Sequence, residues 1–97
     1  MATTDTVLRL RLYVAGSAPN SARARENLAA LCRGLAPERL DLEVVDVLRE
    51  PMRALEDRVF VTPLLCKLAP PPEARVVGDL SDHAQVRRAL GLEEVEP

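Results

Sequence analysis

The sequence predicts a single α/β domain that begins with a βαβ unit. Residues 7–15 alternate between apolar and polar side chains, which is the period of a strand with one buried face. Residues 24–35 repeat apolar side chains at helical spacing, and residues 40–48 alternate again. Two strands joined by such a helix are expected to run parallel in one sheet. The chain has 97 residues, which suits one ordinary domain, so we expect residues 1–97 to form a single unit.

The second half of the chain predicts a further helix, two strands and a last helix. Pro51 stands where proline suits the first turn of a short helix. Residues 59–68 are mostly apolar, and they fit a strand at their start but either a strand or a helix toward their end. Residues 74–77 predict a short strand, and residues 86–92 have a helical pattern that could also lie as a short strand. The complete order is therefore β-α-β-α-β-β-α.

Polar residues mark the expected ends of the helices and of the chain. Asn20 or Ser21 is expected to cap the first helix and Ser81 the last, because a side-chain oxygen can accept from a free backbone N–H there. Gly91 suits the C-terminal end of the last helix. Residues 1–6 and 94–97 are polar or acidic and are expected to be frayed.

The order of elements, with Thr62-Pro63 before the third strand, is the layout of a thioredoxin-like domain. In that fold we predict a cis peptide bond between Thr62 and Pro63. A thioredoxin-type enzyme carries its nucleophilic cysteine in the turn after the first strand, where the helix N-terminus stabilises a thiolate. Residues 15–21 occupy that turn and contain no cysteine. We therefore predict that the protein is not an enzyme and has no catalytic residue.

The two cysteines leave one enzymatic alternative open. Cys32 lies on the apolar side of the first predicted helix and is interpreted as a small buried hydrophobic residue. Cys66 is also interpreted as structural, although a reactive Cys66 would fit a thiol oxidoreductase. Two cysteines and one histidine are too few for an ordinary zinc site, so no metal or cofactor is expected.

Composition narrows the remaining function classes. The net charge is −2 and the aromatic residues are only Tyr13 and Phe60, which argues against a nucleic-acid partner. No apolar run reaches the length of a membrane span, and the first residues lack the pattern of a signal peptide. We therefore expect a cytoplasmic protein that works by binding another protein. Arg9 and Arg11 are expected to lie beside Asp41 and Glu43 as weak pairs on a solvated sheet face.

A combination of motifs resembles the KaiB family from about residue 7 to residue 93. The motifs are LYVAGSAPNS at 12–21, VDVLREP at 45–51, EDR at 56–58 leading to Thr62-Pro63, PPP at 70–72 and GDLSD at 78–82. The resemblance implies an adaptor that binds KaiC, a ring-shaped hexameric ATPase with autokinase activity, and modulates its cycle. A sensor-kinase input domain shares this pattern, so an adaptor of that kind is an alternative.

The resemblance also implies self-association and a second fold. KaiB-like proteins re-pair the C-terminal half as β-α-α-β, which makes the complete order β-α-β-β-α-α-β, and assemble as tetramers; a dimer is a further expectation. We assign Pro63, Gly91 and Glu93 to the balance between the two folds. In some systems the family also binds the activator KaiA. Glu43 stands where the family often has lysine, which puts a KaiA interaction in question.

Two arginines are the expected contacts with the ATPase ring. Arg58 follows two acidic residues and precedes an apolar run, so its cation is easily presented to a partner. Arg23 on the first predicted helix is the second candidate. Each could instead be an exposed arginine in an ion pair of little energetic value.

Overall fold

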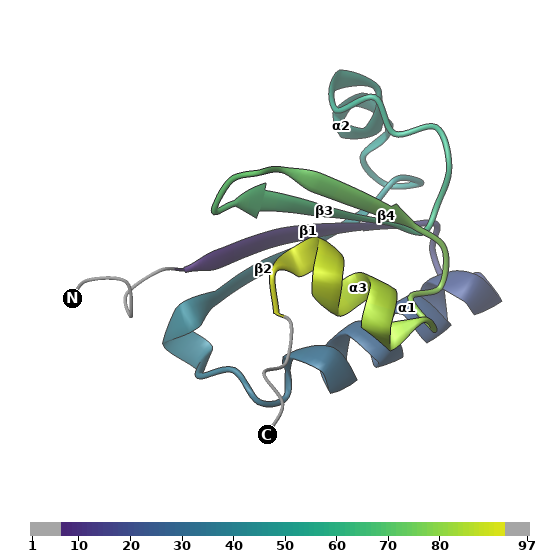
Figure 1. Ribbon diagram of the computed structural model, residues 1–97. Coiled ribbons are helices and arrows are strands. Elements are labelled where there is room, and N and C mark those ends of the chain that lie inside the picture. The colour runs from purple at the N-terminus through teal and green to yellow at the C-terminus, as the bar shows by residue number, and fades with distance from the viewer. Residues whose placement is uncertain (1–6, 93–97) are drawn as a thin grey trace.

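The computed structural model describes residues 7–92 of the chain. The expectation that residues 1–6 and 94–97 are frayed lies outside the described residues, and so does the assignment of Glu93 to fold balance. The element order is β-α-β-α-β-β-α, as predicted, with one additional 3-10 turn before the second strand (Figure 1). The elements are β1 (Leu8–Val14), α1 (Pro19–Cys32), the 3-10 turn η2 (Pro37–Arg39), β2 (Leu40–Asp46), α2 (Pro51–Glu56), β3 (Leu64–Ala69), β4 (Ala74–Val77) and α3 (His83–Leu90).

The four strands form one sheet in the order β2-β1-β3-β4. β1 and β2 are parallel, as the predicted βαβ unit requires, and β3 is antiparallel to both β1 and β4. β1 is therefore a central strand, although it comes first in the sequence. The register places Arg11 beside Glu43 on one side and beside Cys66 on the other. Cys66 in turn lies beside Arg75, so charged side chains from three strands share one face.

The two faces of the sheet are covered differently. α1 and α3 lie together on one face, while α2 stands away from the sheet on the other side (Figure 1). The helix-covered face holds the main core, whose fully buried members include Leu10, Leu12, Leu28, Leu65 and Val86. The opposite face, called the open face below, has a smaller cluster of Tyr13, Val45, Leu64 and Cys66.

The cap of the first helix differs from the prediction. α1 begins at Pro19, because proline has the backbone geometry of a first helical turn and needs no N–H partner there. Asn20 and Ser21 consequently lie inside the helix, and Ala18 at the N-cap makes no side-chain hydrogen bond. The buried Ser21 hydroxyl instead accepts from the Ala15 N–H at 3.0 Å, which ties the helix to the end of β1.

The ends of the last helix agree in part with the prediction. The N-cap is Asp82 rather than Ser81, since the Asp82 carboxylate accepts from the Gln85 N–H at 3.1 Å. Gly91 is the C-cap, as predicted, with a left-handed φ of 76° that glycine adopts easily. A Cβ added to Gly91 would lie 3.6 Å from the Lys67 Nζ.

The ambiguous apolar segment is resolved into a loop followed by a strand. Residues 59–63 form the loop, and β3 then begins at Leu64, immediately after Pro63. The peptide bond between Thr62 and Pro63 is cis, as predicted. The strand expected at the start of the segment is therefore wrong, because residues 59–63 form no strand. Of the two interpretations of residues 64–68, the strand is confirmed as part of β3 and the helix is wrong.

Candidate functional site

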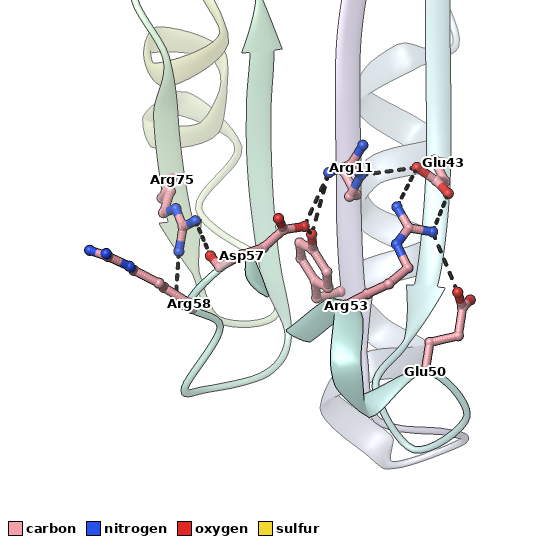
Figure 2. A network of polar contacts seen from close by, with 8 residues as sticks. Arg11, Glu43, Glu50, Arg53, Asp57, Arg58 and Arg75 are labelled. Carbon is pink, nitrogen blue, oxygen red and sulfur yellow. Dashed lines mark hydrogen bonds and ion pairs between the residues drawn. The ribbon is translucent and has the colours of Figure 1, made fainter. Parts of the chain in front are cut away.

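The open face and the loop that follows α2 meet in a network of polar contacts. We call residues 57–63 the α2–β3 loop. Figure 2 shows Asp57 and Arg58 at the start of this loop, next to Arg75 of β4 and Arg11 of β1. α2 stands away from the sheet, and these contacts attach the start of the loop to the open face, together with Val59, which packs against the apolar cluster there.

The Asp57 carboxylate anchors the loop through its side chain. The Tyr13 hydroxyl donates a hydrogen bond to Asp57 Oδ2, and Arg11 Nη1 donates to the same oxygen at 3.2 Å. Tyr13 is 1% exposed, so its ring lies in the apolar cluster of the open face and only its hydroxyl reaches the carboxylate. This arrangement lets a buried aromatic residue keep a polar partner, as tyrosine usually does.

Arg75 holds the same loop through the backbone. Its Nη2 donates to the carbonyl oxygen of Asp57 at 2.6 Å, and its Nη1 donates to that of Arg58 at 3.1 Å. Arg58 has a φ of 58°, which is uncommon for a residue with a side chain. The guanidinium group of Arg75 thus bridges two successive carbonyl groups at a turn of the chain.

Glu43 connects the open face to α2. Arg11 Nε donates to Glu43 Oε1 at 2.9 Å, and Arg53 of α2 donates to both carboxylate oxygens, at 2.6 and 3.0 Å. The pKa of Glu43 is lowered to about 2, first by the hydrogen bonds from Arg53 and then by the one from Arg11. The predicted pairing of Arg11 with Glu43 is confirmed, but the carboxylate is shared with an arginine of a second element rather than lying in an isolated surface pair. Arg9 and Asp41 form the weak exposed pair that was expected, at 3.9 Å.

Large apolar side chains are exposed on α2 and on the segments beside it. Phe60 is 85% exposed, and Leu48, Met52 and Leu55 are each at least 64% exposed. A groove of about 410 Å³ runs between α2 and the α2–β3 loop. We call it the α2 groove, and it is lined by Val47, Pro51, Ala54, Leu55, Val59, Phe60, Val61 and Thr62.

The structure does not bring the two candidate contact arginines together. Arg58 is exposed, and its side chain points away from the other labelled residues of the network (Figure 2). Arg23 is also exposed, but it belongs to α1 on the other side of the sheet, where it donates to the Asn20 side chain at 2.8 Å.

Both cysteines are buried, which agrees with their structural interpretation. Cys32 is 8% exposed in the main core and Cys66 is 4% exposed in the cluster of the open face. Burial raises the pKa of both thiols, so the thiolate forms are disfavoured. Within residues 7–92, no three histidine, cysteine, aspartate or glutamate side chains converge as a metal site. None of the helices described is long and apolar enough to cross a membrane.

The sequence interpretation did not identify Tyr13, Asp57 or Arg75 as parts of this site. Tyr13 and Asp57 are 44 residues apart, and a pattern within one strand gives no sign of such a contact. A signal for Arg75 was present in the alternation of the predicted strands, because alternating positions of neighbouring strands share a face. Its carbonyl partners, however, belong to a loop whose path no local pattern fixes.

Comparison with known proteins identifies the relatives of this chain. The KaiB domain family model matches residues 11–92. The circadian clock oscillator protein KaiB of Prochlorococcus marinus (strain MIT 9312) is 45% identical over 83 residues, which cover 86% of this chain and 79% of that protein. The protein of the same name from Gloeothece citriformis (strain PCC 7424) is 43% identical, again over 83 residues, covering 86% of this chain and 78% of that protein.

Two solved structures have a similar fold. The N-terminal domain of Synechococcus elongatus SasA is similar with a TM-score of 0.69 and 27% identity, over 95% of this chain and 90% of that one. Chloroplastic thioredoxin z is similar with a TM-score of 0.74 and 16% identity, over 91% of this chain and 79% of that one. The second likeness concerns the fold alone, and it supports the thioredoxin-like interpretation of the element order.

Proposed function

This chain belongs to the KaiB family, and from that membership we propose that it is a non-enzymatic adaptor in a clock or timer system. In this proposal it binds a KaiC-type hexameric ATPase with autokinase activity and modulates the cycle of that partner. It would act in the cytoplasm and without a cofactor.

The observation that carries the proposal is the apolar surface around the α2 groove. Phe60 is 85% exposed in a chain with only two aromatic residues, and Met52 and Leu55 of α2 are also largely exposed. Contiguous apolar side chains on a surface commonly mark a site where another protein binds. An enzyme of this size would be expected to place a reactive group in such a groove, whereas the residues that line this one are almost all aliphatic or aromatic.

Arg58 adds a charge to the edge of this surface. It is the second residue of the α2–β3 loop, and its guanidinium forms no ion pair within residues 7–92. A free cation beside an apolar patch provides both attraction and orientation for a partner with an acidic rim. We therefore propose Arg58 as a direct contact with the ring and Arg23, on the other side of the sheet, as a peripheral one.

The test is a charge reversal of Arg58. Arg58→Glu is expected to weaken binding to a purified KaiC hexamer by more than about tenfold, because an attraction becomes a repulsion. Titration calorimetry measures the dissociation constant, and thermal unfolding checks that the fold is intact. Arg88→Glu is the control, because Arg88 is exposed on α3, away from α2. Equal affinities of Arg58→Glu and the parent would remove Arg58 from the interface, and failure of the parent to bind any KaiC hexamer would overturn the proposed function.

The likeness to the N-terminal domain of SasA favours a second candidate of the same class. In that alternative the chain acts as an adaptor equivalent to a sensor-kinase input domain. Competition separates the two: an adaptor that shares the binding mode of that domain will displace it from KaiC. Simultaneous binding of both would count against a shared mode.

The thiol oxidoreductase alternative has less support. Both thiols are buried with raised pKa values, and the turn at residues 15–21 has no cysteine. Alkylation of the native protein with iodoacetamide distinguishes an adaptor from an enzyme. Slow modification of Cys32 and Cys66 is expected, whereas a thiol modified within seconds at neutral pH would favour the enzyme.

The second fold and self-association remain proposals. Gly91 has a left-handed φ, so any other residue there is strained in the fold described above. This supports assigning Gly91 to the balance between the thioredoxin-like order and the β-α-β-β-α-α-β order, with Pro63 at the start of the segment that re-pairs. Dimers or tetramers of the second form would be detected by light scattering.

A further inference from the structure

On the basis of the function proposed above, we infer that Arg75 is a positioning residue that aims Arg58 at the partner. It does so by holding the backbone of the α2–β3 loop against the open face of the sheet. Arg58 makes the contact with the ATPase ring, and Arg75 acts through it.

The geometry of Arg75 suits this role. Its guanidinium donates to two successive carbonyl oxygens, those of Asp57 at 2.6 Å and Arg58 at 3.1 Å. Two parallel donors on one rigid plane fix the orientation of the chain as well as its distance, which a lysine ammonium cannot do. The backbone of Arg75 is itself fixed, because it pairs with Cys66 of β3 in the sheet. We call these two hydrogen bonds the Arg75 clamp. Through them, the position of β4 determines the position of the loop.

The backbone of Arg58 needs such support. Its φ of 58° is a left-handed conformation that is uncommon for a residue with a side chain and persists only where surrounding contacts impose it. Two of these contacts belong to the end of α2, where the N–H groups of Arg58 and Val59 donate to the carbonyl oxygens of Leu55 and Ala54 at 3.1 and 2.9 Å. The bonds from Arg75 hold the same turn from the side of the sheet. With this φ the Arg58 side chain extends away from the network, while its carbonyl group turns back to Arg75 (Figure 2). The two directions are linked through one Cα atom, so releasing the carbonyl also releases the side chain.

The side chain of Asp57 provides a second anchor for the loop. The Asp57 carboxylate is held by Tyr13 and Arg11 of β1, whereas the Asp57 carbonyl is held by Arg75 of β4. Asp57 is therefore held both by its side chain and by its backbone carbonyl group, and Arg58 is the next residue in the chain. A contact residue that is already oriented loses less conformational entropy when it binds.

The experiment compares Arg75→Met, Arg75→Lys and Arg58→Ala, together with the double variant Arg58→Ala/Arg75→Met. Arg75→Met is expected to weaken binding to the purified KaiC hexamer by about 3- to 10-fold, because the backbone at Arg58 would then have to be ordered when the complex forms. Arg75→Lys keeps the charge but loses the fork, so a similar loss is expected. In the Arg58→Ala background, Arg75→Met should cause no further loss, because Arg75 acts only through Arg58.

A measurement without the partner tests the clamp itself. Trypsin cleavage after Arg58, followed by mass spectrometry, should be faster in Arg75→Met and Arg75→Lys than in the parent, while thermal unfolding shows the same cooperative transition. Parent-like affinity of Arg75→Lys would mean that charge alone matters and would overturn the inference. Additive losses in the double variant would do the same, because Arg75 would then contact the ring directly.

The two proposals fail in different ways. If Arg58→Ala binds like the parent, the proposed contact is wrong and the positioning role falls with it, even where trypsin shows that the clamp exists. If Arg58→Ala binds weakly but Arg75→Met binds like the parent, the proposed function stands and the inference about Arg75 is wrong.

Discussion

The helix-covered face of the sheet is packed with aliphatic side chains, whereas the open face carries arginines and carboxylates arranged around one tyrosine. β1 contributes to both, since Leu10 and Leu12 point to the covered face and Arg11 and Tyr13 to the open one. Burial of aliphatic side chains supplies most of the folding free energy of such a domain. Partly exposed polar contacts contribute less free energy, but their directional hydrogen bonds fix the orientation of the groups that they join. The difference assigns stability to one face and the orientation of a binding loop to the other.

The largest expected effect on stability lies on the covered face. Leu65 is fully buried there, so Leu65→Ala is expected to lower the free energy of unfolding by about 2–5 kcal/mol, through lost burial and the cavity left behind. Leu55→Ala on α2 makes the same chemical change at a site that is 64% exposed and should cost less than about 0.5 kcal/mol. Urea unfolding measures both. Similar costs for the two variants would contradict the division between the faces.

A smaller effect is expected from the tyrosine of the open face. Tyr13→Phe keeps the ring and removes the hydroxyl that donates to Asp57, which should cost about 1–2 kcal/mol of unfolding free energy, the usual range for a hydrogen bond to a charged group. Arg9→Gln breaks an ion pair on the same strand and face, but both partners are 61% exposed and the loss should be near zero. Hydrogen exchange of the Arg58 and Val59 amides should accelerate in Tyr13→Phe only. Unchanged exchange there would mean that the bond from the Tyr13 hydroxyl does not help to anchor the loop.

The smallest effect concerns pH. The pKa of Glu43 falls from an ordinary value of 4.5 to about 2 on folding, so its contribution to stability is present above pH 4.5 and is lost as the pH falls toward 2. Glu43→Gln should therefore flatten the decline of stability between pH 4.5 and 2. Glu26→Gln is the matched control, because Glu26 is exposed on α1 and pairs with no arginine within residues 7–92. Parallel pH profiles of the two variants would show that the bonds from Arg53 and Arg11 do not act on folding.

The sequence predicted the elements of the covered face better than the contacts of the open face. Alternation and helical spacing located β1, α1 and α3, because burial against one core imposes a regular period on the chain. Alternation also located β2, although Val45 is the one buried residue of that strand. The predicted starts of the helices were less accurate, because neighbouring residues compete to begin or cap each helix. α1 begins at Pro19, so Asn20 and Ser21 lie within the helix and do not cap it. Asp82, rather than Ser81, caps α3.

The polar site could be predicted only in its strand-borne part. The pairing of Arg11 with Glu43 follows from two parallel strands in the expected register. The contacts of Asp57 with Tyr13 and of Arg75 with the loop depend on where residues 57–63 run after α2. That path results from side-chain contacts over long sequence separations, and no residue pattern within the loop encodes it.

The central place of β1 in the sheet has a consequence for synthesis on the ribosome. β1 is translated before the strands on both of its sides, and its edge toward β3 has no partner until residues 64–69 have emerged. An unpaired nascent strand can associate with the same strand of a neighbouring polysome chain. Arg9 and Arg11 place two positive charges among the leucines of β1, and such charges discourage like strands from pairing. Arg11, which in the finished protein binds Glu43 and Asp57, thus also disfavours association between unfinished chains.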